Sequence, residues 1–448
     1  MEKKKQKSKY SKKFISNVRN YIKLYKLILP AAFFGVMIIG MLIAMIYPIR
    51  PTFSEKEKRE LAKFPSFSFA TLFDGSFFKG IDTWYSDTFP MRERLISNAG
   101  KLSEMRGFGD RIYGLNDNIQ QTIPDPVQPG STNPDETTEP TEPPIPDQID
   151  AVTQSLSNIV VIGDAAYEYC AFNQKVADKY ASVINKTAAA MKGKGRVFSM
   201  LVPTSTDIMI SDNVRKTINS CDQSAAMDYI YGSLSSDANY VNIFKTMRMH
   251  RNEYIYYRTD HHWTALGAYY AYRDLVSAAG FNPRDIEKFD KTSYGDFLGS
   301  FYTDTNNTSM KNHPDELIAY MPKYKTHLKY TDTKGTTVEW KLINDVTNYN
   351  VSMKYSAFTA GDNPFTVIDN LSKEKGKTCM VIKESFGNAI IPFIAGHYKK
   401  VYVVDYRYYK KGFITFAKQN KVDDIIFINN MSAVRSEKLI TRMDAIAQ

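Results

Sequence analysis

Cysteine is scarce in this sequence. The three cysteines, Cys170, Cys221 and Cys379, lie far apart in a chain of 448 residues. A disulfide-stabilised domain carries a dense and even set of cysteines, and a zinc site needs cysteines or histidines at short spacings. The sequence therefore predicts neither a disulfide framework nor a metal site, and no cofactor is expected.

Net charge is nearly absent beyond residue 26. Residues 1–26 hold ten Lys or Arg and one acid, which accounts for +9 (ten minus one) of the net charge of +10. The remaining chain is close to neutral, so its overall basicity gives no reason to expect a nucleic-acid partner. We interpret the tail as a cytoplasmic segment that sets topology and is attracted to anionic lipid head groups.

One long apolar run follows this tail. Residues 27–49 are 23 residues without a charge, which is enough for a helix to span about 30 Å of hydrocarbon. A cleaved signal peptide is the alternative, but it would have a shorter apolar core followed by a small-x-small site, and residues 45–50 offer none. The pattern predicts a single-pass membrane anchor with the N-terminus in the cytoplasm and everything after residue 50 outside.

Composition divides the outer part into three segments. Residues 50–122 are charged and aromatic and are predicted to form membrane-proximal helices. Residues 123–150 contain eight prolines, seven acids and no basic residue, which is typical of a disordered linker. Residues 151–448 are predicted to form one globular domain.

The globular part alternates between strand and helix patterns. Short apolar runs typical of buried strands occur at residues 158–162, 196–202, 378–383, 400–404 and 424–428. A helical pattern covers residues 174–191, where apolar residues recur every three or four positions before Gly193. This alternation predicts an α/β fold around a mostly parallel sheet, in which ligands bind at the carboxyl ends of the strands.

Residues 303–370 interrupt that alternation. They are polar, and Lys334-Gly335 is predicted to turn a hairpin between residues 328–330 and 338–342. A polar insertion near residues 303–370 either shapes substrate entry or is decoration outside the fold.

The segment Asp260-His261-His262-Trp263 places two of six histidines beside an acid. Thr264 is a good N-cap for a helix over residues 265–279, so His262 is expected just before a helix N-terminus. In an extended loop Asp260 and His262 would point the same way, and the carboxylate would fix the imidazole tautomer. His261 would then point to the other side and serve a structural role.

A serine and an asparagine follow two of the predicted strands. Ser385 lies where the strand at 378–383 passes into a helix, with helix amides available to an oxyanion, although serine is also a common N-cap. Asn430 follows the strand at 424–428, where its amide could donate to an oxyanion or simply make a turn. Paired with the Asp-x-His unit, Ser385 becomes the predicted nucleophile.

At these residues the chain resembles a known family. The Asp-His-His-Trp tetrad, the Ser-Phe-Gly-Asn segment at 385–388 and the tyrosine-rich run at 402–409 resemble the bacterial DHHW protein family. That family is similar to the alginate O-acetyltransferases of the SGNH hydrolase superfamily, and the resemblance covers about residues 50–115 and 156–440. It implies a flavodoxin-like α/β/α sandwich and transfer or hydrolysis of acetyl esters on extracellular polysaccharide.

The resemblance also implies roles for particular residues. Asp260 and His262 match the family's Asp-x-His pair and Ser385 its nucleophile, in the chain order of the alginate enzymes. The residues expected to bind the oxyanion or substrate are Gly387, Asn430 and Arg407. Glu384 is a departure, because the family commonly has Asp before the nucleophile.

The resulting hypothesis is an extracytoplasmic serine-dependent O-acetyltransferase or acetylesterase that acts on a cell-surface or secreted polysaccharide. An enzyme outside the membrane has no acetyl-coenzyme A. A polytopic membrane O-acyltransferase is therefore expected as the acyl donor, an inference from the resemblance and the predicted compartment.

Three alternatives remain open from the sequence. A noncatalytic carbohydrate-binding or scaffold protein would use clustered tyrosines for sugar stacking, namely Tyr254, Tyr256, Tyr257, Tyr269 and Tyr270. A metal site at His261 and His262 lacks a third His or Cys at short spacing. Ser205 follows the strand at 196–202 and is a second candidate nucleophile, but no glycine follows it.

Overall fold

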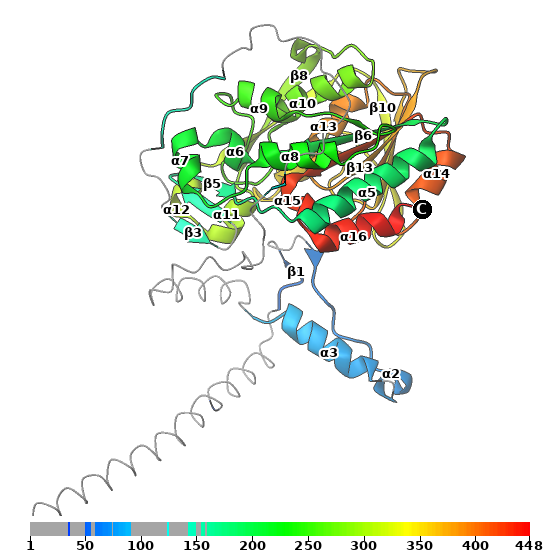
Figure 1. Ribbon diagram of the computed structural model, residues 1–448. Helices are drawn as coiled ribbons and strands as arrows, with labels where there is room; N and C mark the ends of the chain where they lie inside the picture. Colours follow the sequence, from blue (N-terminus) through cyan, green and yellow to red (C-terminus); the bar gives the residue numbers. More distant parts are fainter. Residues whose placement is uncertain are drawn as a thin grey trace, which may run out of the picture. The chain divides into compact units, whose positions relative to one another are not determined.

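The computed structural model describes residues 35, 50–54, 59–73, 75–90, 123–124, 142–148, 154–156 and 159–448 (Figure 1). The chain divides into two compact units, residues 1–105 and 106–448, and each is described by itself. The predicted basic tail, the predicted span at 27–49 except residue 35, and most of the predicted linker lie outside the described residues. Within the described part, no helix has both the length and the apolar character needed to cross a bilayer.

The first unit holds a short strand pair and two helices. β1 (Phe53–Ser54) pairs antiparallel with β2 (Arg59–Glu60), and α2 (Phe69–Phe73) precedes α3 (Ser76–Asp87). The guanidinium of Arg50 lies 3.9 Å from the ring centroid of Trp84 and donates to Thr88 Oγ1 at 3.0 Å. These contacts attach the chain before β1 to the C-terminal half of α3.

An eight-stranded mixed sheet forms the centre of the second unit. Its strands are β6 (Arg196–Val202), β7 (Asn239–Tyr240), β10 (Thr326–Thr331), β11 (Thr337–Trp340), β12 (Phe365–Asn370), β13 (Thr378–Lys383), β14 (Lys400–Asp405) and β15 (Asp424–Asn430). Their order is β11-β10-β12-β14-β13-β15-β6-β7. The pairings from β14 to β7 are parallel, and those that join β11, β10, β12 and β14 are antiparallel.

The predicted strands at 196–202, 378–383, 400–404 and 424–428 are thus confirmed, and they form the parallel part of the sheet. The run at 158–162 is different. It forms β4 (Ile159–Ile162), which joins β3 (Gln154–Leu156) and β5 (Ala165–Glu168) in a separate antiparallel sheet. A short apolar run does not reveal which strand it will pair with.

Residues 303–370 are part of the fold and not decoration outside it. They supply β10, β11 and β12, which complete one side of the main sheet, and β9 (Asp315–Pro322), which pairs with β8 (Phe289–Phe297). The predicted hairpin is confirmed, because β10 and β11 pair across a turn in which Gly335 has φ 87°. A glycine suits that position since it has no Cβ to clash.

Helices cover both faces of the main sheet (Figure 1). On one face lie α5 (Gln174–Met191), α8 (Gln223–Gly232), α14 (Phe413–Gln419) and α16 (Glu437–Ile446), and on the other lie α9 (Phe244–Met249), α10 (Ala265–Ala278) and α13 (Gly387–Ile394). Along β13, Cys379 and Val381 join one core whereas Met380 and Ile382 join the other, since strand side chains alternate between faces. The unit is therefore a three-layer α/β/α arrangement.

Shorter elements lie in the connections. They are α6 (Ser205–Met209), α7 (Asp212–Thr217), α11 (Ser300–Thr305), α12 (Thr308–Asn312), α15 (Met431–Val434) and the 3-10 turns η1 (Ile286–Lys288) and η2 (Lys354–Ala357). The predicted helices at 174–191 and 265–279 are confirmed as α5 and α10.

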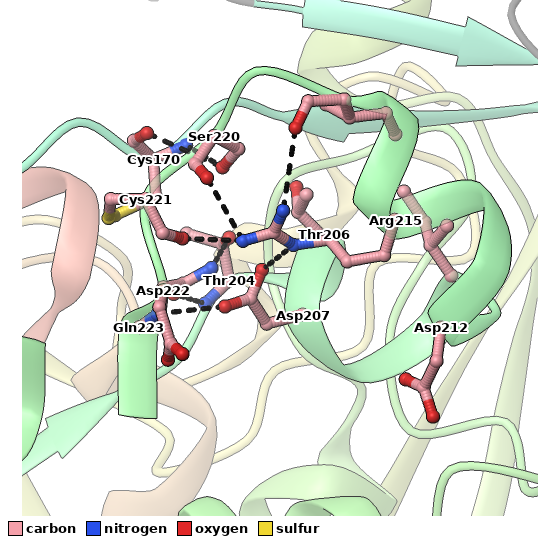
Figure 2. A network of polar contacts seen from close by, with 12 residues as sticks. Cys170, Thr204, Thr206, Asp207, Asp212, Arg215, Ser220, Cys221, Asp222 and Gln223 are labelled. Atoms are coloured by element: carbon pink, nitrogen blue, oxygen red, sulfur yellow. Dashed lines mark hydrogen bonds and ion pairs between the residues drawn. A yellow bond between two sulfur atoms is a disulfide. The ribbon is translucent and has the colours of Figure 1, made fainter. Parts of the chain in front are cut away.

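The cysteine prediction is wrong for one pair. Cys170 and Cys221, separated by 51 residues, form a disulfide with their Cα atoms 5.2 Å apart. Arg215 pairs with Asp207 and donates to the Cys221 carbonyl at 2.6 Å, so hydrogen bonds also hold the loop that carries Cys221 (Figure 2). The spacing gave no signal, because only the folded chain brings the loop after β5 to the connection between α7 and α8.

Candidate active site

Ser385 lies at the carboxyl edge of the main sheet. β13 ends at Lys383, and α13 begins at Gly387, so Ser385 occupies the tight connection between them. A Cβ at Gly387 would approach the Lys383 Cβ to 2.6 Å, which explains why glycine is required where the helix turns back over the strand. Ser385 is 8% exposed and lines a cavity.

Two contacts fix the C-terminal end of the tetrad loop. Thr264 caps α10, its hydroxyl accepting from the Gly267 amide at 3.2 Å, as the sequence predicted. Trp263 is fully buried, and its Nε1 donates to the carbonyl of Phe386 at 3.0 Å. This bond ties the loop that carries His262 directly to the loop that carries Ser385.

Ser385, His262 and Asp260 form a continuous hydrogen-bonded chain. His262 Nε2 lies 2.8 Å from Ser385 Oγ, and His262 Nδ1 lies 2.5 Å from Asp260 Oδ1. Asp260 is 1% exposed, and a buried carboxylate keeps the proton on Nδ1 and leaves Nε2 to accept from the serine hydroxyl. The structure thus brings together the three residues that the sequence paired across 123 positions.

A glycine and a helix amide hold the Asp260 carboxylate in place. Its Oδ1 also accepts from the His262 amide at 3.0 Å, and its Oδ2 accepts from the Ser300 amide at 2.7 Å. A Cβ at Gly299 would lie 2.5 Å from Asp260 Cγ. Glycine at this position therefore leaves the space that the carboxylate occupies.

Tyr355 covers the imidazole and was not predicted from the sequence. Its ring stacks on His262 at a centroid distance of 3.9 Å and an interplanar angle of 14°, and its hydroxyl donates to the Ser385 carbonyl at 3.4 Å. Burial raises the pKa of the Tyr355 phenol well above its ordinary value, so it stays neutral. Tyr355 comes from residues 303–370, and no local pattern there marked it.

Glu384 accepts hydrogen bonds from two loops. Its Oε2 accepts from the Phe386 amide at 3.0 Å, and its Oε1 accepts from the Asn430 amide at 3.0 Å. Ser385 Oγ also lies 3.3 Å from Oε2, farther than from His262. Burial raises the pKa of Glu384. This carboxyl group therefore joins the loop after β13 to the end of β15.

The predicted oxyanion donors already have partners. The Gly387 amide donates to the Glu384 carbonyl at 3.0 Å. Asn430 Nδ2 donates to the Val202 carbonyl at 3.3 Å, while Asn430 Oδ1 accepts from the Ser432 amide at 2.8 Å. One N–H of the Asn430 side-chain amide is left for a further acceptor, since that group carries two.

Arg407 lines the cavity but is held by carboxylates. It donates to Asp405 at 2.9 and 2.6 Å and pairs with Asp362 at 2.9 Å. Burial alone would raise the pKa of Asp362, but Arg407 and Lys383 lower it well below the ordinary value. Arg407 is therefore part of a buried ion-pair group at the base of the site, with one surface toward the cavity.

A cavity of about 300 Å³ lies beside Ser385, and its wall includes Glu168, His261, Ser300, Arg407 and Ser432. The prediction that His261 points away from His262 is wrong. The two imidazole centroids are 3.9 Å apart and tilted by 35°, and His261 Nδ1 lies 2.6 Å from Ser300 Oγ. The loop is too sharply bent for residues in sequence to alternate as in a strand.

The alternative assignments find less support in the geometry. Asp260, His261 and His262 hold their ligand atoms within 4.8 Å of one another, yet both His262 nitrogens are already used by Asp260 and Ser385. An ion would have to break those bonds. Ser205 is buried on α6 and does not line the cavity.

The tyrosines proposed for sugar stacking belong to the interior. All five are part of, or pack against, the core on the α10 face, and none lines the cavity beside Ser385. The Tyr256 hydroxyl, for example, donates to the Pro203 carbonyl at 2.6 Å. Tyr256, Tyr257 and Tyr269 are buried in this core, whereas Tyr270 lines a separate cavity that also includes His250.

Comparisons with known proteins agree on the fold. A family model described as "DHHW protein" matches residues 57–128 and 129–404. The crystal structure of a DHHW family protein from Eubacterium siraeum DSM 15702 is similar at 26% identity and a TM-score of 0.58, covering 64% of this chain and 93% of that one. No curated protein matches the chain.

Two further solved structures are similar at lower identity. Bacillus cereus PatB1, solved with a sulfonyl adduct, matches at 17% identity and a TM-score of 0.54, over 65% of this chain and 98% of that one. The O-acetyltransferase domain of Pseudomonas putida AlgJ matches at 11% identity and a TM-score of 0.37, over 64% and 98%. The PatB1 likeness shows the fold alone, and the AlgJ likeness is too loose to carry an argument.

Proposed function

This chain belongs to the DHHW protein family, and we propose that it is a serine-dependent O-acetyltransferase or acetylesterase acting on polysaccharide outside the cell membrane. The observation that carries the proposal is the buried chain from Ser385 Oγ through His262 to Asp260, with contacts of 2.8 and 2.5 Å. Its place at the carboxyl edge of a three-layer α/β/α unit supports an SGNH-hydrolase-like site.

The reaction proceeds in two steps at one serine. His262 Nε2 takes the proton of Ser385 Oγ as that oxygen attacks the acyl carbonyl, and Asp260 stabilises the imidazolium. The imidazolium returns its proton to the departing alcohol when the ester bond breaks, leaving an acyl-serine. A sugar hydroxyl or water then attacks this ester while His262 takes its proton, and Ser385 recovers the proton as it leaves.

Stabilisation of the oxyanion falls to the side chain of Asn430 and the backbone amide of Ser385. The Gly387 amide already donates to the Glu384 carbonyl, whereas one N–H of the Asn430 side chain remains after its bond to Val202. Glu384 supports this arrangement because it fixes the Asn430 backbone to the loop of the nucleophile. Arg407 lines the same cavity, where it is paired with Asp405 and Asp362.

The disulfide supports an extracytoplasmic location. Disulfides persist in oxidising compartments and are rare in the cytosol, and Cys170 and Cys221 form one in the same unit as the site. With the predicted span at 27–49, this supports a single-pass protein whose cytoplasmic end is the basic tail. A polytopic membrane O-acyltransferase would then supply acyl groups, and a cell-surface or secreted polysaccharide would receive them.

A chromogenic acetyl-ester assay on the purified full-length chain tests the proposal. Ser385→Ala and His262→Ala should each lower the release of chromophore by at least about a thousandfold, because triad members act as a unit. Ser205→Ala is the matched control, a buried serine outside the cavity, and should keep the wild-type rate. If the Ser385→Ala protein keeps the wild-type rate of chromophore release, the proposed mechanism is wrong.

Covalent labelling gives an independent readout. An arylsulfonyl fluoride should react with Ser385 Oγ, forming an oxygen–sulfur bond and releasing fluoride, and mass spectrometry should locate the adduct on the peptide that contains residue 385. The label should be absent from Ser385→Ala. A folded wild-type protein that neither turns over esters nor takes the label favours the noncatalytic carbohydrate-binding alternative.

A further inference from the structure

Among the described residues, His261 is the histidine that lines the cavity and has no role in the proposed reaction. Its backbone amide donates to Ser300 Oγ at 3.4 Å, and its Nδ1 lies 2.6 Å from the same oxygen. The Ser300 hydroxyl accepts from the amide and has one proton, which it can donate to Nδ1. When the Ser300 hydroxyl donates to Nδ1, the ring proton of His261 is on Nε2.

This imidazole stays neutral. Burial, followed by the neighbouring His262, lowers the pKa of His261 below its ordinary value. A neutral ring with a proton on Nε2 is a hydrogen-bond donor and brings no net charge. Since Nδ1 is held by Ser300, the Nε2 edge is the polar part of the ring left for whatever enters the cavity.

Ser432 adds a second polar group to the same wall. Its Oγ is buried and has no hydrogen-bond partner within the described part of the chain, although its amide is fixed by Asn430 Oδ1 at 2.8 Å. A buried hydroxyl without a partner destabilises the folded chain, because water no longer satisfies it. A ligand hydroxyl that donates to it and accepts from it would remove that cost.

The charges around the cavity select the kind of ligand. Glu168 and Asp304 both line it, Glu168 being paired with Arg435 at 3.0 Å, and Arg407, the basic residue of the lining, is already paired with Asp405 and Asp362. An anionic sugar would meet these carboxylates without an unpaired cation. A volume of about 300 Å³ is at the lower end of small-ligand sites, which suits a single sugar residue of a longer chain.

We propose that His261, oriented by Ser300, and Ser432 form an acceptor subsite for the hydroxyl groups of an uncharged sugar residue. Hydrogen bonds from His261 Nε2 and to Ser432 Oγ would hold that residue so that one of its hydroxyls faces His262. This inference rests on the proposed acyl transfer and names its acceptor as a neutral polyol. Uronate-rich and phosphate-bearing polymers are excluded as preferred acceptors.

The test separates transfer to sugar from release of the donor alcohol. The full-length chain is given a chromogenic acetyl ester with either a neutral glucose oligomer or a galacturonate oligomer, and acetylated sugar is counted by mass spectrometry alongside released chromophore. His261→Ala should lower the ratio of transfer to release about tenfold or more, which is the loss of one hydrogen bond of about 1.4 kcal/mol. His261→Gln, which keeps an N–H donor, should restore part of that ratio.

Ser432→Ala provides a second variant if His261→Ala does not fold, and it should lower the same ratio. Ser205→Ala should leave the ratio unchanged. The wild type should acetylate the glucose oligomer at least tenfold better than the galacturonate oligomer. Equal transfer to both oligomers, transfer to water alone, or an unchanged ratio in folded His261→Ala and Ser432→Ala overturns the subsite.

A binding measurement keeps this inference distinct from the proposed function. Calorimetry of Ser385→Ala with the glucose oligomer should show binding that is weakened about tenfold when His261→Ala is added. If wild type releases no chromophore but this binding pattern holds, the acyl-transfer proposal fails and the sugar site stands. If release depends on Ser385 but the added variant binds as well as its parent, the subsite fails alone.

Discussion

Gly299→Ala adds one methyl group beside the proposed catalytic aspartate. The backbone at Gly299, with φ −85° and ψ −152°, is extended, so alanine meets no conformational barrier there. The new Cβ would lie 2.5 Å from Asp260 Cγ, far inside the contact distance of two carbon atoms. Either the Asp260 carboxylate or the start of α11 must move by about 1 Å, a distance that relieves such an overlap.

The size of the effect follows from what this movement breaks. A misplacement of about 1 Å costs roughly a hundredfold in rate. Complete loss of the 2.5 Å contact from Asp260 to His262 would have the effect of removing the orienting carboxylate, which lowers the rate roughly ten-thousandfold. We therefore expect kcat/KM for an acetyl ester to fall by about 10² to 10⁴, or about 3 to 5 kcal/mol of transition-state stabilisation.

Gly396→Ala is the matched control for overpacking. Its Cβ would meet Tyr324 and Arg284 at 2.9 and 3.2 Å, at the end of α13 away from Ser385. Both variants should lose about 1–3 kcal/mol of stability in urea unfolding, but only Gly299→Ala should lose the ester activity. A folded Gly299→Ala protein within threefold of the wild-type kcat/KM would refute the argument that Asp260 acts from this position.

Two predictions concern stability. Burial, followed by the nearby cations, lowers the pKa of His397 to about 4. Above pH 6.5 the imidazole is neutral in both the folded and the unfolded chain. Below pH 6.5 it becomes protonated in the unfolded chain but stays neutral in the folded one. The free energy of unfolding should therefore fall by at most about 3 kcal/mol between pH 6.5 and 4, and solvent screening reduces this figure. In urea titrations, His397→Gln should make the free energy of unfolding less dependent on pH over this range. Reduction of the Cys170–Cys221 disulfide, which closes a loop of 51 residues, should lower the free energy of unfolding by up to about 4 kcal/mol, because the unfolded chain gains loop entropy. An unchanged urea midpoint in dithiothreitol, or in Cys221→Ser, would contradict this prediction.

Local patterns were enough to find most strands and the three residues that the structure joins by hydrogen bonds, Ser385, His262 and Asp260. The runs at 196–202 and 378–383 became β6 and β13 with the predicted bounds, because buried strands are continuous apolar runs. Ser385 was found because a strand ended there and a glycine followed. Its link to His262 came from chemistry, because a histidine held by a carboxylate is the usual partner that activates a serine hydroxyl.

Features set by distant parts of the chain were missed. The run at 158–162 had the right conformation but the wrong sheet, since a strand's partner is chosen by the fold. Tyr355 reaches His262 from 93 positions away, and Cys170 meets Cys221 across 51. The predicted orientation of His261 was wrong because side chains in a bent loop do not alternate between two sides as they do in a strand.

The place of β15 bears on when the main sheet can close while the chain is made. β15 is the last strand in the chain and separates β13 from β6 in the sheet, where Asp424 pairs with Arg196 from 228 residues earlier. Such distant closures are slow because the entropy of ordering the loop is lost before contacts form. Until residues 424–430 have been made, β13 and β6 have no strand between them, and the parallel part of the sheet stays divided. The main sheet can therefore close only when the last strand of the chain has arrived.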